Sequence, residues 1–229
     1  VVRKLSLSGG VRDIPTQIWA SELGEKVISS PALADGYLYI ATDQGSIFKI
    51  KANSGEILQR WATGTDRIWS SLHVFESSLV LTDMSKGRMI FLDLMSGERM
   101  GELDLNGGVP GDGLFVNQTG YIGTFASELL RVNLDRPEID WRISTDGWIV
   151  GQPVIGGSNL YASTTRGAIY SVDMNSGRIL WFRSYLESNF RARAVIYRDS
   201  IILVDRDGLV LALELDTGNK IWESVTGRD

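Results

Sequence analysis

The chain has 229 residues, of which 43% are hydrophobic, enough for one large domain or two small ones with a buried core. Its formal net charge of −5 argues against a nucleic-acid-binding surface, and no apolar run approaches the roughly 18 residues of a membrane span. The absence of cysteine excludes disulfides, thiolate metal sites and a cysteine nucleophile. The single histidine, His73, is expected to be a packed or surface residue rather than a catalytic base.

Short runs of alternating apolar residues follow one another along the whole chain, as in residues 37–40, 46–50, 201–204 and 209–213. This alternation predicts β-strands, and no window shows a sustained helical period. The tight turns between the runs recur about 40 residues apart. The first turn of each unit is predicted at Asp35-Gly36, Ser77-Ser78, Thr119-Gly120, Ser158-Asn159 and Asp199-Ser200.

These landmarks divide the chain into a half repeat over residues 1–26 and five complete repeats over about 27–66, 67–107, 108–146, 147–188 and 189–229. Four strands in each unit of about forty residues predict an all-β fold, a β-propeller of four-stranded blades. The half repeat holds strands over 1–7 and 17–21 and lacks two others. The chain is therefore a segment of a larger propeller, a six-bladed ring with one thin blade, or half of an assembly closed by another chain.

Two stretches carry a resemblance to a known family. Ser29-Ser30-Pro31 opens one repeat before a turn and a strand, and residues 172–181 and 215–222 each end on a Gly turn followed by a tryptophan. This pattern resembles the pyrroloquinoline quinone (PQQ) repeat family, the quinoprotein-like β-propellers. The resemblance implies that one tryptophan per repeat packs between blades, here Trp19, Trp141, Trp181 and Trp222. Gln59 and Gly101 stand where two further tryptophans are expected, so we expect weaker or different packing there.

The same resemblance raises the question of a cofactor. Quinoprotein alcohol dehydrogenases of this family have a vicinal cysteine pair and a calcium site with a catalytic aspartate, and this chain has no cysteine. Its candidate acids, Asp43, Asp83, Asp205 and Asp207, lie at or near turns, where aspartate typically bonds the local backbone. We therefore expect no metal and no cofactor, with PQQ and calcium as the alternative.

A ligand or partner site is expected at the mouth of the central channel, because the resemblance places the first strand of each blade innermost. The candidate residues there are Arg67, Trp69, Asp112, Trp148, Gln152, Arg191 and Arg193. Arg191 and Arg193 are two residues apart and would share one face of a strand, where they could hold an anion or a partner carboxylate. In the simpler alternative, the arginines pair with Asp112 or solvent and the aromatic residues plug the channel.

The leading functional hypothesis is a non-catalytic scaffold for protein–protein interaction, periplasmic or extracellular. This hypothesis rests on the resemblance of the chain to quinone-free members of the family, such as outer-membrane assembly lipoproteins, although the chain has no lipobox cysteine. The open edge of the strand over residues 1–7 favours pairing with another chain, including self-association. The alternatives are a ligand-sensing domain of a larger receptor, with Arg191 and Arg193 binding an anion, and a PQQ-dependent dehydrogenase.

Overall fold

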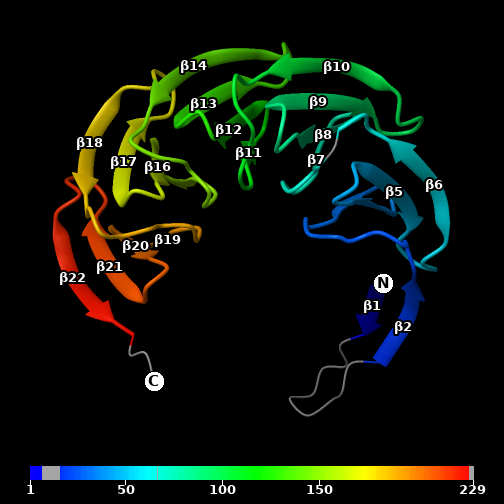
Figure 1. Ribbon diagram of the computed structural model, residues 1–229, viewed down its shortest axis with the longest axis horizontal. Coiled ribbons are helices and arrows are strands. Elements are labelled where there is room, and N and C mark those ends of the chain that lie inside the picture. The colour runs from blue at the N-terminus through cyan, green and yellow to red at the C-terminus, as the bar shows by residue number, and fades with distance from the viewer. Residues whose placement is uncertain (7–15, 66, 227–229) are drawn as a thin grey trace. The chain divides into compact units, whose positions relative to one another are not determined.

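A computed structural model describes residues 1–6, 16–65 and 67–226. These residues form 22 strands arranged in six sheets, five of four strands and one of two (Figure 1). None of the described residues forms a helix long and apolar enough to cross a membrane. The predicted all-β fold of repeated four-stranded propeller blades is confirmed.

The chain divides into two compact units, Val1–Asp83 with Ile90–Gly101 and Met84–Met89 with Glu102–Asp229. The first unit opens with the two-stranded sheet of β1 (Val2–Ser6) and β2 (Thr16–Ser21). The blade that follows consists of β3 (Ala32–Ala34), β4 (Tyr37–Ala41), β5 (Ser46–Lys51) and β6 (Ile57–Ala62). The next blade, which contributes residues to both units, consists of β7 (His73–Phe75), β8 (Ser78–Thr82), β9 (Arg88–Asp93) and β10 (Arg99–Asp104).

The second unit contains three further blades in chain order (Figure 1). The first consists of β11 (Leu114–Val116), β12 (Thr119–Gly123), β13 (Glu128–Asn133) and β14 (Glu138–Ser144). The second consists of β15 (Val154–Gly156), β16 (Asn159–Ser163), β17 (Ala168–Asp173) and β18 (Ile179–Ser184). The third consists of β19 (Val195–Tyr197), β20 (Ser200–Val204), β21 (Leu209–Glu214) and β22 (Lys220–Val225).

The first hairpin of every blade turns through a residue in the left-handed region. These residues are Asp35, Glu76, Asn117, Gly157 and Arg198, with φ between 49° and 62°. Two-residue hairpins need positive φ to match the twist of their strands. The first turns of the last four blades lie one or two residues earlier than predicted. Their left-handed residue is not one of the small polar residues that the prediction used but a residue before them: Glu76, Asn117, Gly157 or Arg198.

Adjacent blades are joined by a tryptophan of one blade that packs on a glycine turn of the next. A Cβ built on Gly218 would lie 2.6 Å from the Trp181 ring, and the indole Nε1 of Trp181 donates to the Leu215 carbonyl at 2.8 Å. Trp19 packs in the same way on Gly55, and Trp141 on Gly177. The glycine has no Cβ and positive φ in each case, so the ring lies directly against the backbone.

The blade β3–β6 has Gln59 at the expected tryptophan position, and its packing is built differently. Trp61, two residues further along β6 and on the same face, packs on Gly97. The buried Lys49 donates from Nζ to the Leu94 carbonyl at 3.2 Å and lies 4.8 Å from the centre of the Tyr37 ring. A lysine and a shifted tryptophan therefore replace the usual indole at this joint.

Two expected positions show no such docking. Gly101 in β10 leaves open space within 4 Å of where a Cβ would stand. Trp222 in β22 is 44% exposed, whereas Trp181 is 8% exposed. Within the described residues, Trp222 has no following blade on which to pack.

Candidate functional site

The predicted channel-mouth residues lie in the loops that connect one blade to the next, and not in strands. The first strand of each blade begins later than expected, at Ala32, His73, Leu114, Val154 and Val195. Arg191 and Arg193 precede β19, so the prediction that they share one face of a strand is wrong. The physical reason is that this loop buries Phe190 and Ala194, 0% and 9% exposed, and turns the two arginines outward.

In the first unit, Arg67 and Trp69 are both exposed and flank Ile68, which is fully buried. The second unit also has an exposed tryptophan beside a buried isoleucine, but in the reverse order, since Trp148 precedes Ile149. The aliphatic residue anchors each loop in the core, and the tryptophan beside it is presented to solvent.

Two adjoining hollows lie on the loops of the second unit, with volumes of about 310 and 660 Å³. We call them the Arg166 hollows, because both are lined by Asp146, Thr165 and Arg166. The smaller hollow is also lined by Ser127, Gly147 and Trp148, and the larger by Leu186, Glu187, Ser188, Asn189 and Asp207. Both hollows are open to solvent, which suits a protein surface segment better than an enclosed small molecule.

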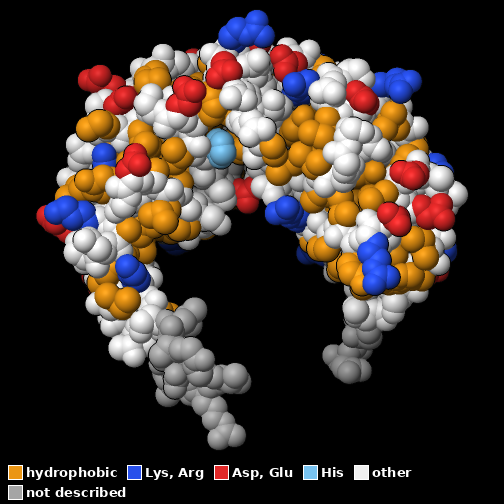
Figure 2. All heavy atoms as spheres, turned by 180° about the vertical axis from the view of Figure 1, so that it is seen from behind, with side chains coloured by type: hydrophobic (Ala, Val, Ile, Leu, Met, Phe, Trp, Pro, Cys, Tyr) orange, Lys and Arg blue, Asp and Glu red, His pale blue; other side chains and the backbone are white. Residues whose placement is uncertain are grey.

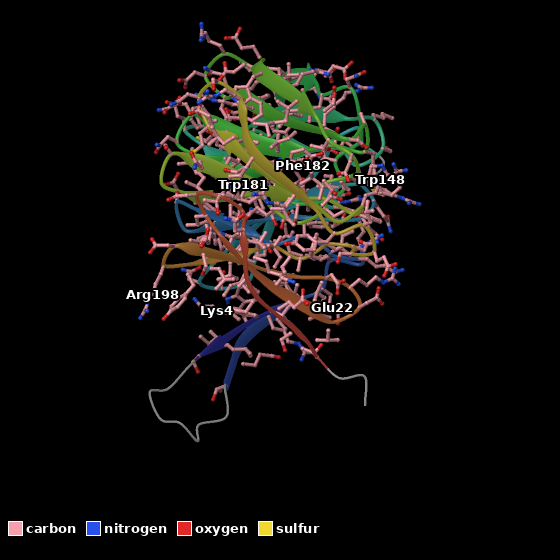
Figure 3. The ribbon with its side chains drawn as sticks, turned by 90° about the vertical axis from the view of Figure 1, so that its left-hand side faces the viewer. Lys4, Glu22, Trp148, Trp181, Phe182 and Arg198 are labelled. Atoms are coloured by element: carbon pink, nitrogen blue, oxygen red, sulfur yellow. The ribbon has the colours of Figure 1, made fainter. Side chains whose placement is uncertain are left out.

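Trp148 forms the apolar wall of the smaller hollow. Its ring meets Phe125 edge-on at 4.9 Å between centroids, and its carbonyl accepts the amide of Thr165 at 2.9 Å. The ring is therefore held in place although it is 44% exposed. Figure 3 shows Trp148 on the opposite side of this unit from Arg198, which lies in the first turn of its blade.

Asp146, the acidic residue that lines both hollows, is already engaged by its neighbours. Asp146 accepts the Thr164 hydroxyl at 2.9 Å, and its amide donates to the Tyr170 hydroxyl at 3.0 Å. Burial raises the pKa of Tyr170, so this hydroxyl stays protonated at neutral pH. Within the described part of the chain, the exposed guanidinium of Arg166 makes no hydrogen bond or ion pair, so it is available to a partner.

The remaining predicted residues differ in what they do. Gln152 donates from Nε2 to the Gly113 carbonyl at 2.8 Å and so ties two loops together. Asp112 is half-buried and has an interaction partner of its own. Arg191 donates from Nε to Asn189, at the rim of the larger hollow, at 3.1 Å. The structure thus places Trp148 in the wall of the smaller hollow, and Arg191 against a residue that lines the larger one. The sequence did not indicate these hollows as a site.

The described residues do not fit a calcium and quinone centre. No group of three or more His, Asp or Glu side chains among them could hold a metal ion. Asp205 Oδ1 accepts the amides of Asp207 and Leu209 at 2.9 and 2.8 Å, as expected for a turn. Backbone and hydroxyl hydrogen bonds from Ser176 likewise lower the pKa of Asp173. These carboxylates hold turns, and we derive no reaction step from them.

Comparison with known proteins places this architecture in a family. The family described as outer membrane protein assembly factor BamB matches residues 12–224. BamB of Burkholderia pseudomallei is 22% identical over 216 residues, which cover 91% of this chain and 47% of that protein. The chain spans about half the length of the curated relatives it matches.

Solved structures show the same fold. The crystal structure of BamB from Moraxella catarrhalis has a TM-score of 0.80 at 19% identity, over 91% of this chain and 65% of that chain. A quinohemoprotein alcohol dehydrogenase from Pseudomonas putida has a TM-score of 0.71 at 12% identity, over 90% of this chain and 42% of that one. The predicted resemblance to PQQ-repeat propellers is confirmed, and at these identities it concerns the fold alone.

Proposed function

Because the chain belongs to the PQQ-repeat family described as outer membrane protein assembly factor BamB, we propose that it is a non-catalytic protein-interaction scaffold. It works in the periplasm or at another extracytoplasmic site, where it takes part in the assembly of outer membrane proteins. It uses neither quinone nor metal. The relatives' names support the assembly role, and the chemistry of the second unit supports binding without catalysis.

The observation that carries this proposal is the surface of the Arg166 hollows. It combines an exposed indole, an exposed leucine and a guanidinium that pairs with none of the described side chains, within open loops held by the blade core. Tryptophan and arginine are the residues most often found at interaction hot spots. Leu186, 87% exposed, adds an apolar contact at the rim. The partner we propose is a protein that presents an apolar side chain beside a carboxylate.

The two alternatives lose the features on which they depended. An anion sensor needed Arg191 and Arg193 on one strand face, and both lie in a loop before β19. A dehydrogenase needed several carboxylates around a metal, and no group of three or more metal-binding side chains lies among the described residues. Neither alternative is favoured by an observation of the site.

The test is a double variant, Trp148→Ala with Arg166→Glu, that replaces the natural gene in its host. We expect lower amounts of outer membrane proteins with the fold retained, because Trp148 is 44% exposed, like Trp222, and its loss should cost about 1 kcal/mol or less. The matched control is Arg198→Ala, an exposed arginine on the opposite side of the same unit. Normal outer membrane protein levels in the double variant would contradict the proposed site.

A further inference from the structure

The loop between β10 and β11 contains the dipeptide Asn106-Gly107, and no other asparagine of the chain is followed by glycine (Figure 1). Asn106 is exposed and has a φ of 60°, in the left-handed region, and Gly107 is half-buried. The Asn106 amide donates to the Asp104 carboxylate at 2.8 Å. Among the described residues, neither the side chain of Asn106 nor the amide of Gly107 has a hydrogen-bond partner. The side-chain amide and the main-chain nitrogen that follows it are therefore both free to react.

This dipeptide lies between two residues whose main chain is fixed. The buried Leu105 donates its amide to the Gly87 carbonyl at 2.7 Å, and the Gly108 carbonyl accepts the Phe125 amide at 2.7 Å. A Cβ built on Gly87 would lie 2.5 Å from the carbonyl carbon of Gly107, so the loop packs directly on a neighbouring turn. All of these residues belong to the second unit. The main chain between the two fixed residues therefore has no room for an additional atom.

We propose that Asn106 is a site of spontaneous modification, at which the side-chain amide is hydrolysed through a cyclic imide. The Gly107 nitrogen bonds to Cγ of Asn106, and the side-chain nitrogen takes up the displaced proton and leaves as ammonia. One water molecule then opens the ring. Attack at Cγ gives aspartate with a normal main chain, whereas attack at the main-chain carbonyl gives isoaspartate, whose main chain is one carbon longer. Glycine favours ring closure, because it has no Cβ to hinder the attacking nitrogen and its main chain rotates freely.

The two products differ in their effect on the loop. Aspartate keeps the length of the main chain and tolerates the left-handed region as asparagine does, so this product leaves the loop unchanged. Isoaspartate adds a carbon between two anchored residues, so the hydrogen bond of Leu105 or that of Phe125 must break. The Phe125 ring meets Trp148 edge-on at 4.9 Å, so loss of its hydrogen bond reaches the wall of the smaller Arg166 hollow.

Asn175 is a matched control in the same unit. It is exposed, and its amide also donates to the aspartate two residues earlier, Asp173, at 3.2 Å. The following nitrogen differs, because the Ser176 amide donates to the same carboxylate at 2.8 Å and is not free to attack. Charge does not favour Asn106 over the control, since Arg131 donates to the Asn175 carbonyl at 3.1 Å and a cation there eases loss of the next amide proton. Figure 2 shows acidic and basic side chains interspersed over one side of the second unit, which therefore carries no broad field of one sign there.

The experiment is peptide mapping by mass spectrometry of the purified, folded chain after incubation at neutral and at mildly alkaline pH, with isoaspartate detected by enzymatic methylation. We expect conversion at Asn106 to be at least about tenfold faster than at Asn175. It should also be faster at the higher pH, because the Gly107 nitrogen must lose its proton. Asn106→Gly, which suits a positive φ, removes the reacting amide and is expected to yield no isoaspartate from this loop. Conversion at Asn106 no faster than at Asn175 would overturn the proposal.

Hydrogen exchange on the separated products tests the effect on the loop. The unmodified, aspartate and isoaspartate forms of the incubated chain are resolved by chromatography. We expect the amide of Leu105 or of Phe125 to exchange about tenfold faster in the isoaspartate form, through loss of its hydrogen bond, and at the natural rate in the aspartate form. Full protection of both amides in the isoaspartate form would overturn the structural effect assigned to the modification.

Discussion

The tryptophans Trp181 and Trp222 offer a matched pair of substitutions, because they occupy the same repeat position in two consecutive blades. Trp181 is 8% exposed, its ring centre lies 5.9 Å from that of Tyr161, and it packs on Gly218 of the next blade. Trp222 is 44% exposed and packs on no described blade. The difference between the two alanine variants therefore measures what docking on the next blade contributes to stability.

Trp181→Ala removes a buried aromatic ring that packs on the backbone of Gly218 and leaves a cavity between the two blades. Such changes typically cost about 3–5 kcal/mol. The lost indole hydrogen bond adds little, because the Leu215 carbonyl still accepts the Tyr161 hydroxyl at 3.1 Å. For a chain of this length, we expect the melting temperature to fall by roughly 6–20 °C. Trp222→Ala should cost about 1 kcal/mol or less.

The assay is thermal unfolding followed by circular dichroism, at a concentration where the chain is monomeric. Hydrogen exchange of β19–β22 accompanies it, since blades of a repeat protein can open separately. In Trp181→Ala the amides of that blade should exchange faster than in the natural chain. Equal melting temperatures for the two variants would refute the docking role assigned to Trp181.

Three further predictions concern the glycine turns, acid stability and cofactor binding. Gly97→Ala should destabilise the chain by more than Gly36→Ala in thermal unfolding, because both have positive φ but only a Cβ on Gly97 would meet the Trp61 ring, at 2.1 Å. The pKa of Glu25 would be raised by burial, but neighbouring hydroxyl groups and Arg60 outweigh burial and lower it. The Glu25 carboxylate therefore contributes its full stability above the ordinary glutamate pKa, and this contribution is lost as the pH falls through the lowered pKa of the folded chain. In urea unfolding, Glu25→Gln should reduce the decline in stability below about pH 5. A decline equal to that of the natural chain would contradict this role of Glu25. Calorimetric titration with PQQ and calcium should show no binding heat, and stoichiometric binding would restore the dehydrogenase hypothesis.

The fold was predictable from the sequence because the repeat signals are local. Alternating apolar residues indicate strands wherever they occur, and Gly turns about forty residues apart show that the unit recurs. The sequence also contains the information needed to predict that Trp61 takes the docking position that Gln59 cannot fill. Gly97 keeps the glycine that a tryptophan would pack on, and a residue two positions along a strand lies on the same face.

The candidate site was harder to predict because it is made of loops. The sequence singled out Trp148 and Arg191 but placed the arginine in a strand, since two arginines two residues apart match the period of a strand. The burial of Phe190 decided the path of that loop, and burial depends on the neighbouring blade. Arg166 gave no signal, because a turn arginine is typical of any hairpin until the loops around it are known.

Site-specific photo-crosslinking at position 148 in living cells shows whether the Arg166 hollows bind a protein partner. A photoreactive amino acid replaces Trp148 in the natural chain, with the same group at position 198, on the other side of the unit, as the control. We expect a crosslink from position 148 to a protein of the outer membrane assembly machinery, and none to that protein from position 198. A crosslink to that machinery from position 198 alone, or from neither position, would contradict it.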